Sequence, residues 1–91
     1  MQMELTELEP VVRLLDEIIN DRTVPKNIRA AAEESKANLN NNGDTWELRI
    51  STAIHILDEI TNDPNMPLYA RTKIWSVVSA LEQKRRELGQ A

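Results

Sequence analysis

Residues 15–21 read Leu-Asp-Glu-Ile-Ile-Asn-Asp, and residues 57–63 read Leu-Asp-Glu-Ile-Thr-Asn-Asp. The two stretches lie 42 residues apart and differ at one position. A period of this length indicates two copies of one supersecondary unit. Working outward, each stretch is followed at matching places by a proline and then by an arginine: Pro25 and Arg29, Pro67 and Arg71. An apolar stretch, an Asn-Asp stop and a proline together predict a helix, a tight turn and a second helix.

The repeat therefore predicts an all-α, single-domain protein made of two αα-hairpins, at residues 6–42 and 44–88. Two hairpins joined by a short turn favour a four-helix up-and-down bundle. A HEAT-type solenoid has a similar period, but it needs about three repeats to bury its faces. The bundle is the favoured architecture for this reason.

Local signals set the expected helix ends. Thr6 and Asp44 each stand three residues before a glutamate, as in a capping box. Pro25 and Pro67 should lie in the first turn of their helices, with Thr23 or Val24 as the cap before Pro25. Gly43 should take the left-handed conformation after the second helix, and Gly89 should end the fourth helix.

Helical spacing also predicts the core. In the second helix the inward residues are mostly small, so that neighbouring helices can approach closely; they are Ile28, Ala31, Ala32, Ser35 and Leu39. In the third helix we expect Trp46, Ile50, Ala53, Leu57 and Ile60 to face inward, with Ile54 and Ile56 on the flanks. In the fourth helix we expect Ala70, Ile74, Val77, Val78, Leu81 and Leu88 to do so.

Composition excludes several classes of protein. The 91 residues contain no cysteine, so disulfides, thiolate metal sites and thiol catalysis are absent. The net charge of −4 disfavours non-specific attraction to nucleic acid or to anionic lipid. There is no basic-then-apolar leader at the start and no apolar run of membrane-spanning length. We expect a soluble, unprocessed, cytoplasmic protein without a cofactor.

The repeated Leu-Asp-Glu-Ile-x-Asn-Asp string, Val24-Pro25 and the run Ile-Leu-Asp-Glu-Ile-Thr-Asn-Asp-Pro-Asn-Met-Pro at residues 56–67 resemble the small archaeal proteins of uncharacterised protein family 0147. The resemblance covers nearly the whole chain. It implies a four-helix up-and-down bundle. The family carries no assigned activity, substrate or cofactor, and no functional residue can be transferred.

The acidic helix ends are the first candidate site. Carboxylates at a helix C-terminus face the negative end of its dipole, and therefore favour a nearby positive charge. The repeat offers Arg29 to Asp21 and Arg71 to Asp63, which predicts two structural Asp/Arg clasps. A hard cation such as Ca²⁺ or Mg²⁺, held by the oxygen-rich turns, is the alternative.

His55, the single histidine, stands three and four residues before Asp58 and Glu59, a spacing that allows a metal or proton-transfer cluster. However, His55 lies opposite the buried stripe of its helix, so we expect it in solvent. A bundle di-metal site needs histidines on two helices. The serines have no histidine base in a recognisable motif. We therefore expect no enzyme activity, with a metal-dependent enzyme as the weakest alternative.

Lys84, Arg85 and Arg86 form the one concentrated basic run of the sequence. Cations in the last turn of a helix stabilise its dipole, which explains the run without a ligand. Contact with structured RNA through these residues remains an alternative function.

The preferred interpretation is a non-enzymatic module for protein–protein interaction, or a scaffold. The apolar face of the first helix is wider than one seam can cover, which favours self-association, most simply as a homodimer. Leu5 and Leu14 lie at the edge of that face, and Trp75 is the outlying aromatic of the fourth helix. These three residues are the candidate interface.

Overall fold

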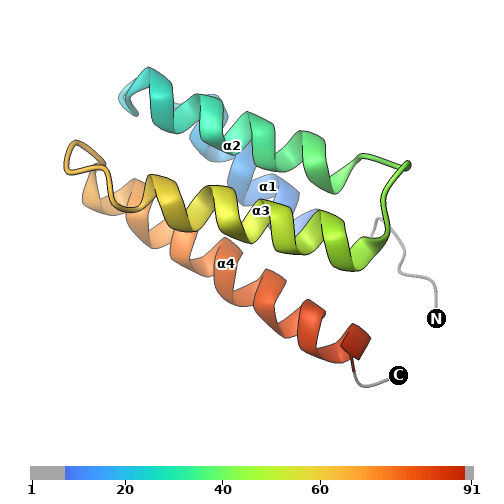
Figure 1. Ribbon diagram of the computed structural model, residues 1–91. Coiled ribbons are helices and arrows are strands. Elements are labelled where there is room, and N and C mark those ends of the chain that lie inside the picture. The colour runs from blue at the N-terminus through green and yellow to red at the C-terminus, as the bar shows by residue number, and fades with distance from the viewer. Residues whose placement is uncertain (1–7, 90–91) are drawn as a thin grey trace.

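The computed structural model describes residues 8–89, and these residues form four α-helices and no strand. The helices are α1 (Glu9–Ile19), α2 (Lys26–Leu39), α3 (Trp46–Ile60) and α4 (Leu68–Gly89). Each helix packs against its neighbours in the chain, and α1 also packs against α4. The α1–α2 and α3–α4 turns lie at one end of the molecule, and the α2–α3 turn lies at the other (Figure 1). The predicted all-α class is confirmed.

All four helices contribute to one apolar core. The positions predicted to be buried in α2 are all buried, and so are those of α4 apart from half-buried Leu88. In α3, Trp46, Ile56 and Ile60 are half-buried, whereas the flanking Ile54 is buried. Burial of a large aliphatic side chain contributes roughly 1.5–3 kcal/mol, so this core is the main source of stability.

The most extensive helix–helix contact is between α2 and α3. The inner face of α2 includes Ala31, Ala32 and Ser35, all of them buried. Small side chains let two helix backbones approach closely, which explains the extent of this contact. The expectation drawn from the alanine-rich stripe is therefore met.

Several expected helix ends need correction. The cap of α3 is Thr45, whose Oγ1 accepts a hydrogen bond from the backbone N–H of Leu48 at 3.2 Å, and not Asp44. Gly43 does not have a positive φ, so the left-handed turn predicted there is wrong. Gly89 is the last residue of α4, as expected. The expected cap at Thr6 lies outside the described residues.

The two repeated prolines lie immediately before the first residues of α2 and α4. Pro25 is itself the N-cap of α2, in place of Thr23 or Val24, and Pro67 directly precedes Leu68. The carbonyl of Pro25 accepts from the N–H of Arg29 at 3.1 Å, and that of Pro67 from the N–H of Arg71 at 3.0 Å. A proline N-terminal to a helix removes no helical hydrogen bond, so neither proline introduces a kink.

Among the described residues, no helix is both long enough and apolar enough to cross a membrane. This agrees with the sequence, whose apolar positions follow a stripe on each helix rather than a continuous run.

Candidate functional site

The aspartates at the ends of the two hairpins close their own turns. The Oδ1 atom of Asp21 accepts from the backbone N–H of Thr23 at 2.9 Å and from its hydroxyl at 2.6 Å. The Oδ1 atom of Asp63 accepts from the backbone N–H of Asn65 at 2.8 Å. Side-chain bonds to a backbone N–H two residues ahead are typical of Asx turns.

These hydrogen bonds stabilise the ionised carboxylates. The hydroxyl and the backbone N–H of Thr23 lower the pKa of Asp21 below its usual value. The backbone N–H of Asn65 and then the side-chain amide of Asn27 lower the pKa of Asp63 in the same way. The positive charge of an arginine adds a smaller effect in each turn, from Arg29 and Arg71 respectively. Both aspartates therefore act as charged turn-closing groups.

The repeated arginines bind the turns through backbone carbonyls, which corrects the expected pairing with carboxylates. Arg29 Nε donates to the carbonyl of Val24 at 3.0 Å. Arg71 donates through Nη1 to the carbonyl of Thr61 and through Nη2 to that of Asp63, the latter at 3.3 Å. Each arginine thus holds the end of the preceding helix or the turn itself through backbone carbonyls.

A third arginine of this kind was missed from the sequence. Arg49 Nε donates to the carbonyl of Asp44 at 3.0 Å, and Nη2 donates to Asn42 Oδ1 at 3.2 Å. Its guanidinium carbon lies 4.2 Å from the centre of the Trp46 ring, and the residue is buried. A guanidinium over an indole face is a favourable cation–π contact.

A short signal in the sequence connects all three turns. Each contains, at or next to its start, an asparagine followed by an Asx residue, and an arginine stands eight residues after that Asx: Asp21 and Arg29, Asn41 and Arg49, Asp63 and Arg71. Asn41 Oδ1 accepts from the backbone N–H of Gly43 at 3.0 Å, as its counterparts do in the other turns. The signal recurs once per helix and turn, about every 20 residues, and the 42-residue repeat includes only its first and third occurrences.

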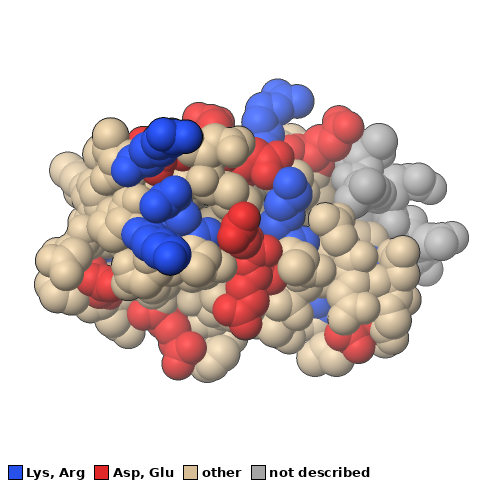
Figure 2. Space-filling model, turned by 90° about the horizontal axis from the view of Figure 1, so that it is seen from above, with Lys and Arg blue, Asp and Glu red and all other residues tan. Residues whose placement is uncertain are grey.

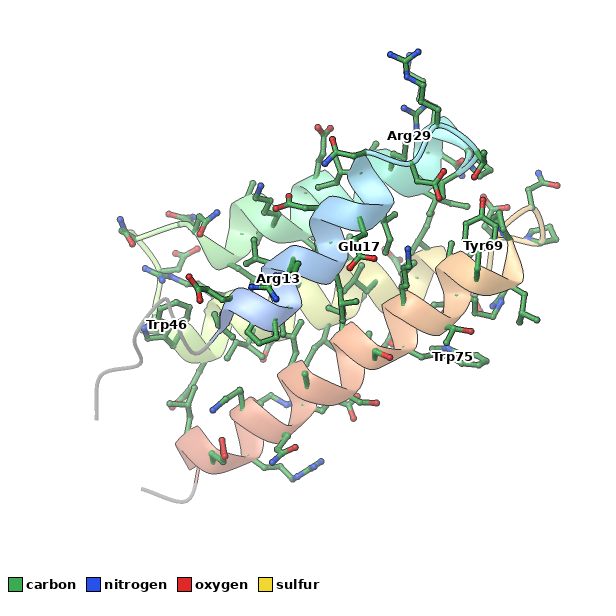
Figure 3. The ribbon with its side chains drawn as sticks, turned by 180° about the vertical axis from the view of Figure 1, so that it is seen from behind. Arg13, Glu17, Arg29, Trp46, Tyr69 and Trp75 are labelled. Atoms are coloured by element: carbon green, nitrogen blue, oxygen red, sulfur yellow. The ribbon has the colours of Figure 1, made fainter. Side chains whose placement is uncertain are left out.

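Polar contacts join the two hairpins at the end where their turns meet. The Thr23 hydroxyl donates to Asp21, so the hydroxyl of Tyr69, which contacts Thr23 Oγ1, is the donor of that pair. The amide of Asn27 donates to Asp63 Oδ2. The first contact connects the α1–α2 turn to the start of α4, where Figure 3 labels Tyr69, and the second connects α2 to the α3–α4 turn.

An ion pair continues this connection along the helices. Lys73 Nζ lies 3.3 Å from Glu17 Oε1, which ties α4 to α1. Both side chains are partly exposed, and such pairs typically contribute up to about 1 kcal/mol.

A shallow groove of about 380 Å³ lies beside α1 and the end of α2; its lining residues are Glu9, Val12, Arg13, Asp16 and Asn40. It continues into a second hollow that shares Asp16 and Asn40. Lys36 Nζ lies 2.7 Å from Asp16 Oδ1 at the junction, so these two charges are paired with each other. The groove was not predicted from the sequence.

The proposed metal cluster is not assembled. His55 and Glu59 lie in solvent with Nε2 and Oε2 3.8 Å apart, and Asp58 is exposed. Within residues 8–89, no group of three or more histidine and acidic side chains is arranged to hold a metal ion. The expectation that His55 lies in solvent is confirmed.

The basic run near the end of α4 is mixed with acids. Lys84 Nζ lies 3.3 Å from Glu87 Oε2, and Arg85 and Arg86 are exposed. Counting Glu82, residues 82–87 hold three cations and two acids. The positive potential of this segment is accordingly weaker than the three adjacent basic residues predict.

The exposed side of α4 differs from that of the other helices. From Leu68 to Ser79 its exposed residues carry no charge; we call them the outer α4 face, and they are Leu68, Tyr69, Thr72, Trp75, Ser76 and Ser79. Leu68 is 74% exposed and Trp75 is 54% exposed. Figure 3 shows Trp75 directed away from the other three helices.

Exposed charges mark the remaining helices. The exposed residues of α1 include Glu9, Arg13 and Glu17, and those of α3 include Asp58 and Glu59. Over α2, basic side chains gather toward the end with the α1–α2 turn, with acidic side chains beside them (Figure 2). Among the described helices, the outer α4 face is therefore distinctive in combining large exposed apolar side chains with an absence of charge.

The three candidate interface residues have different environments. Trp75 is exposed, as expected of an outlying aromatic. Leu14 is half-buried and packs against the core, which leaves little of it for a partner. Leu5 lies outside the described residues.

Comparison with known proteins places this geometry in a family. The chain is 62% identical over 76 residues to the protein MJ1419 of Methanocaldococcus jannaschii, with 84% of this chain and 82% of that protein covered. It is 42% identical over 82 residues to the protein TV0625 of Thermoplasma volcanium, with 90% and 92% covered. Both relatives are described as UPF0147 proteins.

Two crystal structures share the fold. The first, of a protein of unknown function named MMP1188, has a TM-score of 0.84 and 45% identity, with 90% of this chain and 93% of that chain covered. The second, of a UPF0147 protein from Thermoplasma acidophilum, has a TM-score of 0.81 and 42% identity, with 87% and 93% covered. The model of the Uncharacterised protein family (UPF0147) matches residues 1–83. The chain therefore belongs to the Uncharacterised protein family UPF0147.

Proposed function

We propose that this protein is a non-enzymatic helical module for protein–protein interaction, and that the outer α4 face is its contact surface. The observation that carries the proposal is the exposure of Leu68 and Trp75 on a face without charge. Large apolar side chains are commonly buried, and aromatic residues are enriched at interface centres. A protein surface that is likewise apolar is the matching partner.

The state of the reactive side chains supports a structural role for the rest of the molecule. The carboxylates of Asp21 and Asp63 accept hydrogen bonds within their turns. The guanidinium groups of Arg29, Arg49 and Arg71 are bound to backbone carbonyls. Groups with the chemistry to act on a substrate are thus used to fix the turns, and the resulting rigid scaffold presents α4 in a defined position.

Site-specific photo-crosslinking in the native cell tests this proposal. A photoreactive phenylalanine analogue at position 75 should give a discrete crosslinked protein product. The same analogue at position 48 is the matched control. The exposed fraction of Leu48, 51%, is similar to that of Trp75, but Leu48 lies on α3. Equal products at both positions, or none at position 75, would contradict the proposed surface.

The architecture that presents this face is the predicted up-and-down bundle of two duplicated hairpins. Support comes from the position of the α1–α2 and α3–α4 turns at the same end of the molecule (Figure 1). Further support comes from the matched bonds of Asp21 to Thr23 and of Asp63 to Asn65. A crystal structure of this chain in which the two hairpins fail to superpose would refute the duplication.

A further inference from the structure

We propose that a second copy of this chain binds the outer α4 face, with the two α4 helices antiparallel and Trp75 of each copy against Ser79 of the other. This inference rests on the proposed function, since it names the partner of the same face. It adds an orientation, a register and a two-fold axis, each of which can be tested separately.

The spacing of residues along α4 provides the seam. Opposite the buried side of α4, residues recur at alternating steps of four and three: Leu68, Thr72, Trp75, Ser79, Glu82 and Arg86. Alternating steps of four and three keep a stripe on one side of a helix, and such a stripe packs along a second helix. Leu68, Thr72, Trp75 and Ser79 are all exposed, so this seam is open in one copy.

Size complementarity selects the antiparallel arrangement. Large Leu68 and Trp75 alternate on the stripe with small Thr72 and Ser79. In a parallel pair, Trp75 would meet Trp75 and Ser79 would meet Ser79. In an antiparallel pair centred on position 77, each Trp75 side chain meets Ser79 of the other copy, so large packs against small and the helices can approach closely.

Charge selects the same arrangement. Each copy carries a net charge of −4, so two copies repel, and the repulsion is smaller where they meet on an uncharged face than where exposed charges of one sign meet. In the antiparallel register, Arg86 comes opposite Leu68 of the second copy and within reach of its Tyr69 ring. The methylene groups of an arginine cover apolar surface, and its guanidinium favours an aromatic face. A parallel pair would instead place Arg86 against Arg86.

Disulfide trapping reads the orientation directly, because the chain has no cysteine of its own. In the proposed register Ser76 lies next to the two-fold axis. It is displaced from Ser76 of the other copy by about two residues, or 3 Å, along the helix. Thr72 is then displaced from its counterpart by about ten residues, or 15 Å, beyond the reach of a disulfide. Under mild oxidation Ser76→Cys should form a covalent dimer rapidly, and Thr72→Cys should not.

Leu48→Cys supplies the background rate of random collision from another exposed site, on α3. Rapid dimer formation by Ser76→Cys alone supports the register. Equal rates for Ser76→Cys and Thr72→Cys, or a rate for Ser76→Cys no higher than that of Leu48→Cys, overturn it. A crosslink from position 75 to a different protein in the cell, with no self-crosslink, would retain the proposed function and refute the second copy as its partner.

Sedimentation equilibrium tests the self-association itself. The mass of the native chain should rise from 10.4 kDa toward twice that value with concentration. Trp75→Asp should weaken association by about 30-fold or more, as expected for an aromatic at the centre of an interface. Leu48→Asp adds the same charge at a similar exposure and should leave association unchanged. A native chain that stays monomeric at every concentration overturns the proposal, and circular dichroism of the variants checks their folding.

Discussion

The α1–α2 and α3–α4 turns have nearly the same sequence pattern, yet they hold their arginines in different ways. Arg29 bonds to the carbonyl five residues before it, whereas Arg71 reaches carbonyls ten and eight residues before it. The α2–α3 turn has a different sequence, yet Arg49 again bonds to the carbonyl five residues before it. The choice of carbonyl by each arginine is therefore not set by the repeated sequence of the turns.

Turn length explains the difference. The first two turns span residues 20–25 and 40–45, and the third spans residues 61–67, which makes it one residue longer. Because α3 ends at Ile60, the carbonyl of Thr61 lies just past the helix, where carbonyls lack a helical partner. Arg71 supplies that partner. The shorter contact of Arg71 is thus with a carbonyl that the helix and the turn leave free.

The strongest test of this comparison is the buried arginine. Arg49→Ala removes two hydrogen bonds and the contact with Trp46, so we expect the free energy of unfolding to fall by about 2–4 kcal/mol. Urea unfolding at neutral pH measures the change. Arg49→Lys keeps the charge without the planar fork and should lose less. If Arg49→Ala lowered the free energy of unfolding by less than Arg29→Ala does, burial of Arg49 would not strengthen its contribution to stability.

The second test compares the two repeated arginines. Arg71→Ala removes the side-chain donor of the Thr61 carbonyl and one of the two donors of the Asp63 carbonyl, and should destabilise by about 2 kcal/mol, whereas Arg29→Ala removes one hydrogen bond and should cost about 1 kcal/mol. Paired denaturation curves give both values. Lys84 forms a partly exposed ion pair with Glu87, and such pairs contribute little. Lys84→Ala should therefore destabilise less than Arg71→Ala. Equal losses at positions 29 and 71 would show that turn length does not matter.

The third test concerns the aspartates of the same turns. Their pKa values in the folded protein lie below the usual value of 3.8, so near pH 4 the unfolded chain binds more protons. Their contribution to stability is therefore present above about pH 4 and is lost as pH falls through the folded pKa values. The double variant Asp21→Asn/Asp63→Asn should show a smaller loss of stability between pH 5 and pH 2. An unchanged pH dependence would show that these two carboxylates do not contribute to it.

The smallest expected effect is at the contact between the two turns. Tyr69→Phe removes the hydroxyl that donates to Thr23 and should lower the free energy of unfolding by about 0.5–1 kcal/mol. Tyr69 is 45% exposed, and water can replace part of the lost bond. Thr23→Val removes this bond and also the bond from the Thr23 hydroxyl to Asp21, so differential scanning calorimetry should show a larger decrease in melting temperature for Thr23→Val than for Tyr69→Phe. A melting temperature of Tyr69→Phe equal to that of the native chain would show that the Tyr69 hydroxyl does not contribute to stability.

The sequence by itself determined the four helices and most of their buried positions. Ile28, Ala31, Ala32, Ser35 and Leu39 all follow from helical spacing, because the period of a helix fixes which side chains share a face. Asn-Asp and proline signals also located the α1–α2 and α3–α4 turns, since they act through the local backbone. The caps were less predictable. Asp44 and Thr45 are neighbours and both residue types cap helices, so a shift of one residue in the helix start changes which of them is the cap.

Tertiary structure alone decided how individual side chains are used. The Asx residue eight positions earlier marks Arg49 as a turn arginine, but its burial against Trp46, in contrast to the exposure of Arg85 and Arg86, depends on the elements that pack nearby. Leu14 is half-covered by the core, whereas Trp75 is left on the surface, although both lie in amphipathic helices. Helical periodicity is a property of a segment and can be calculated from spacing. The cover over each face is a property of the assembled chain, since it depends on the lengths of the turns and on which helix comes to lie against which.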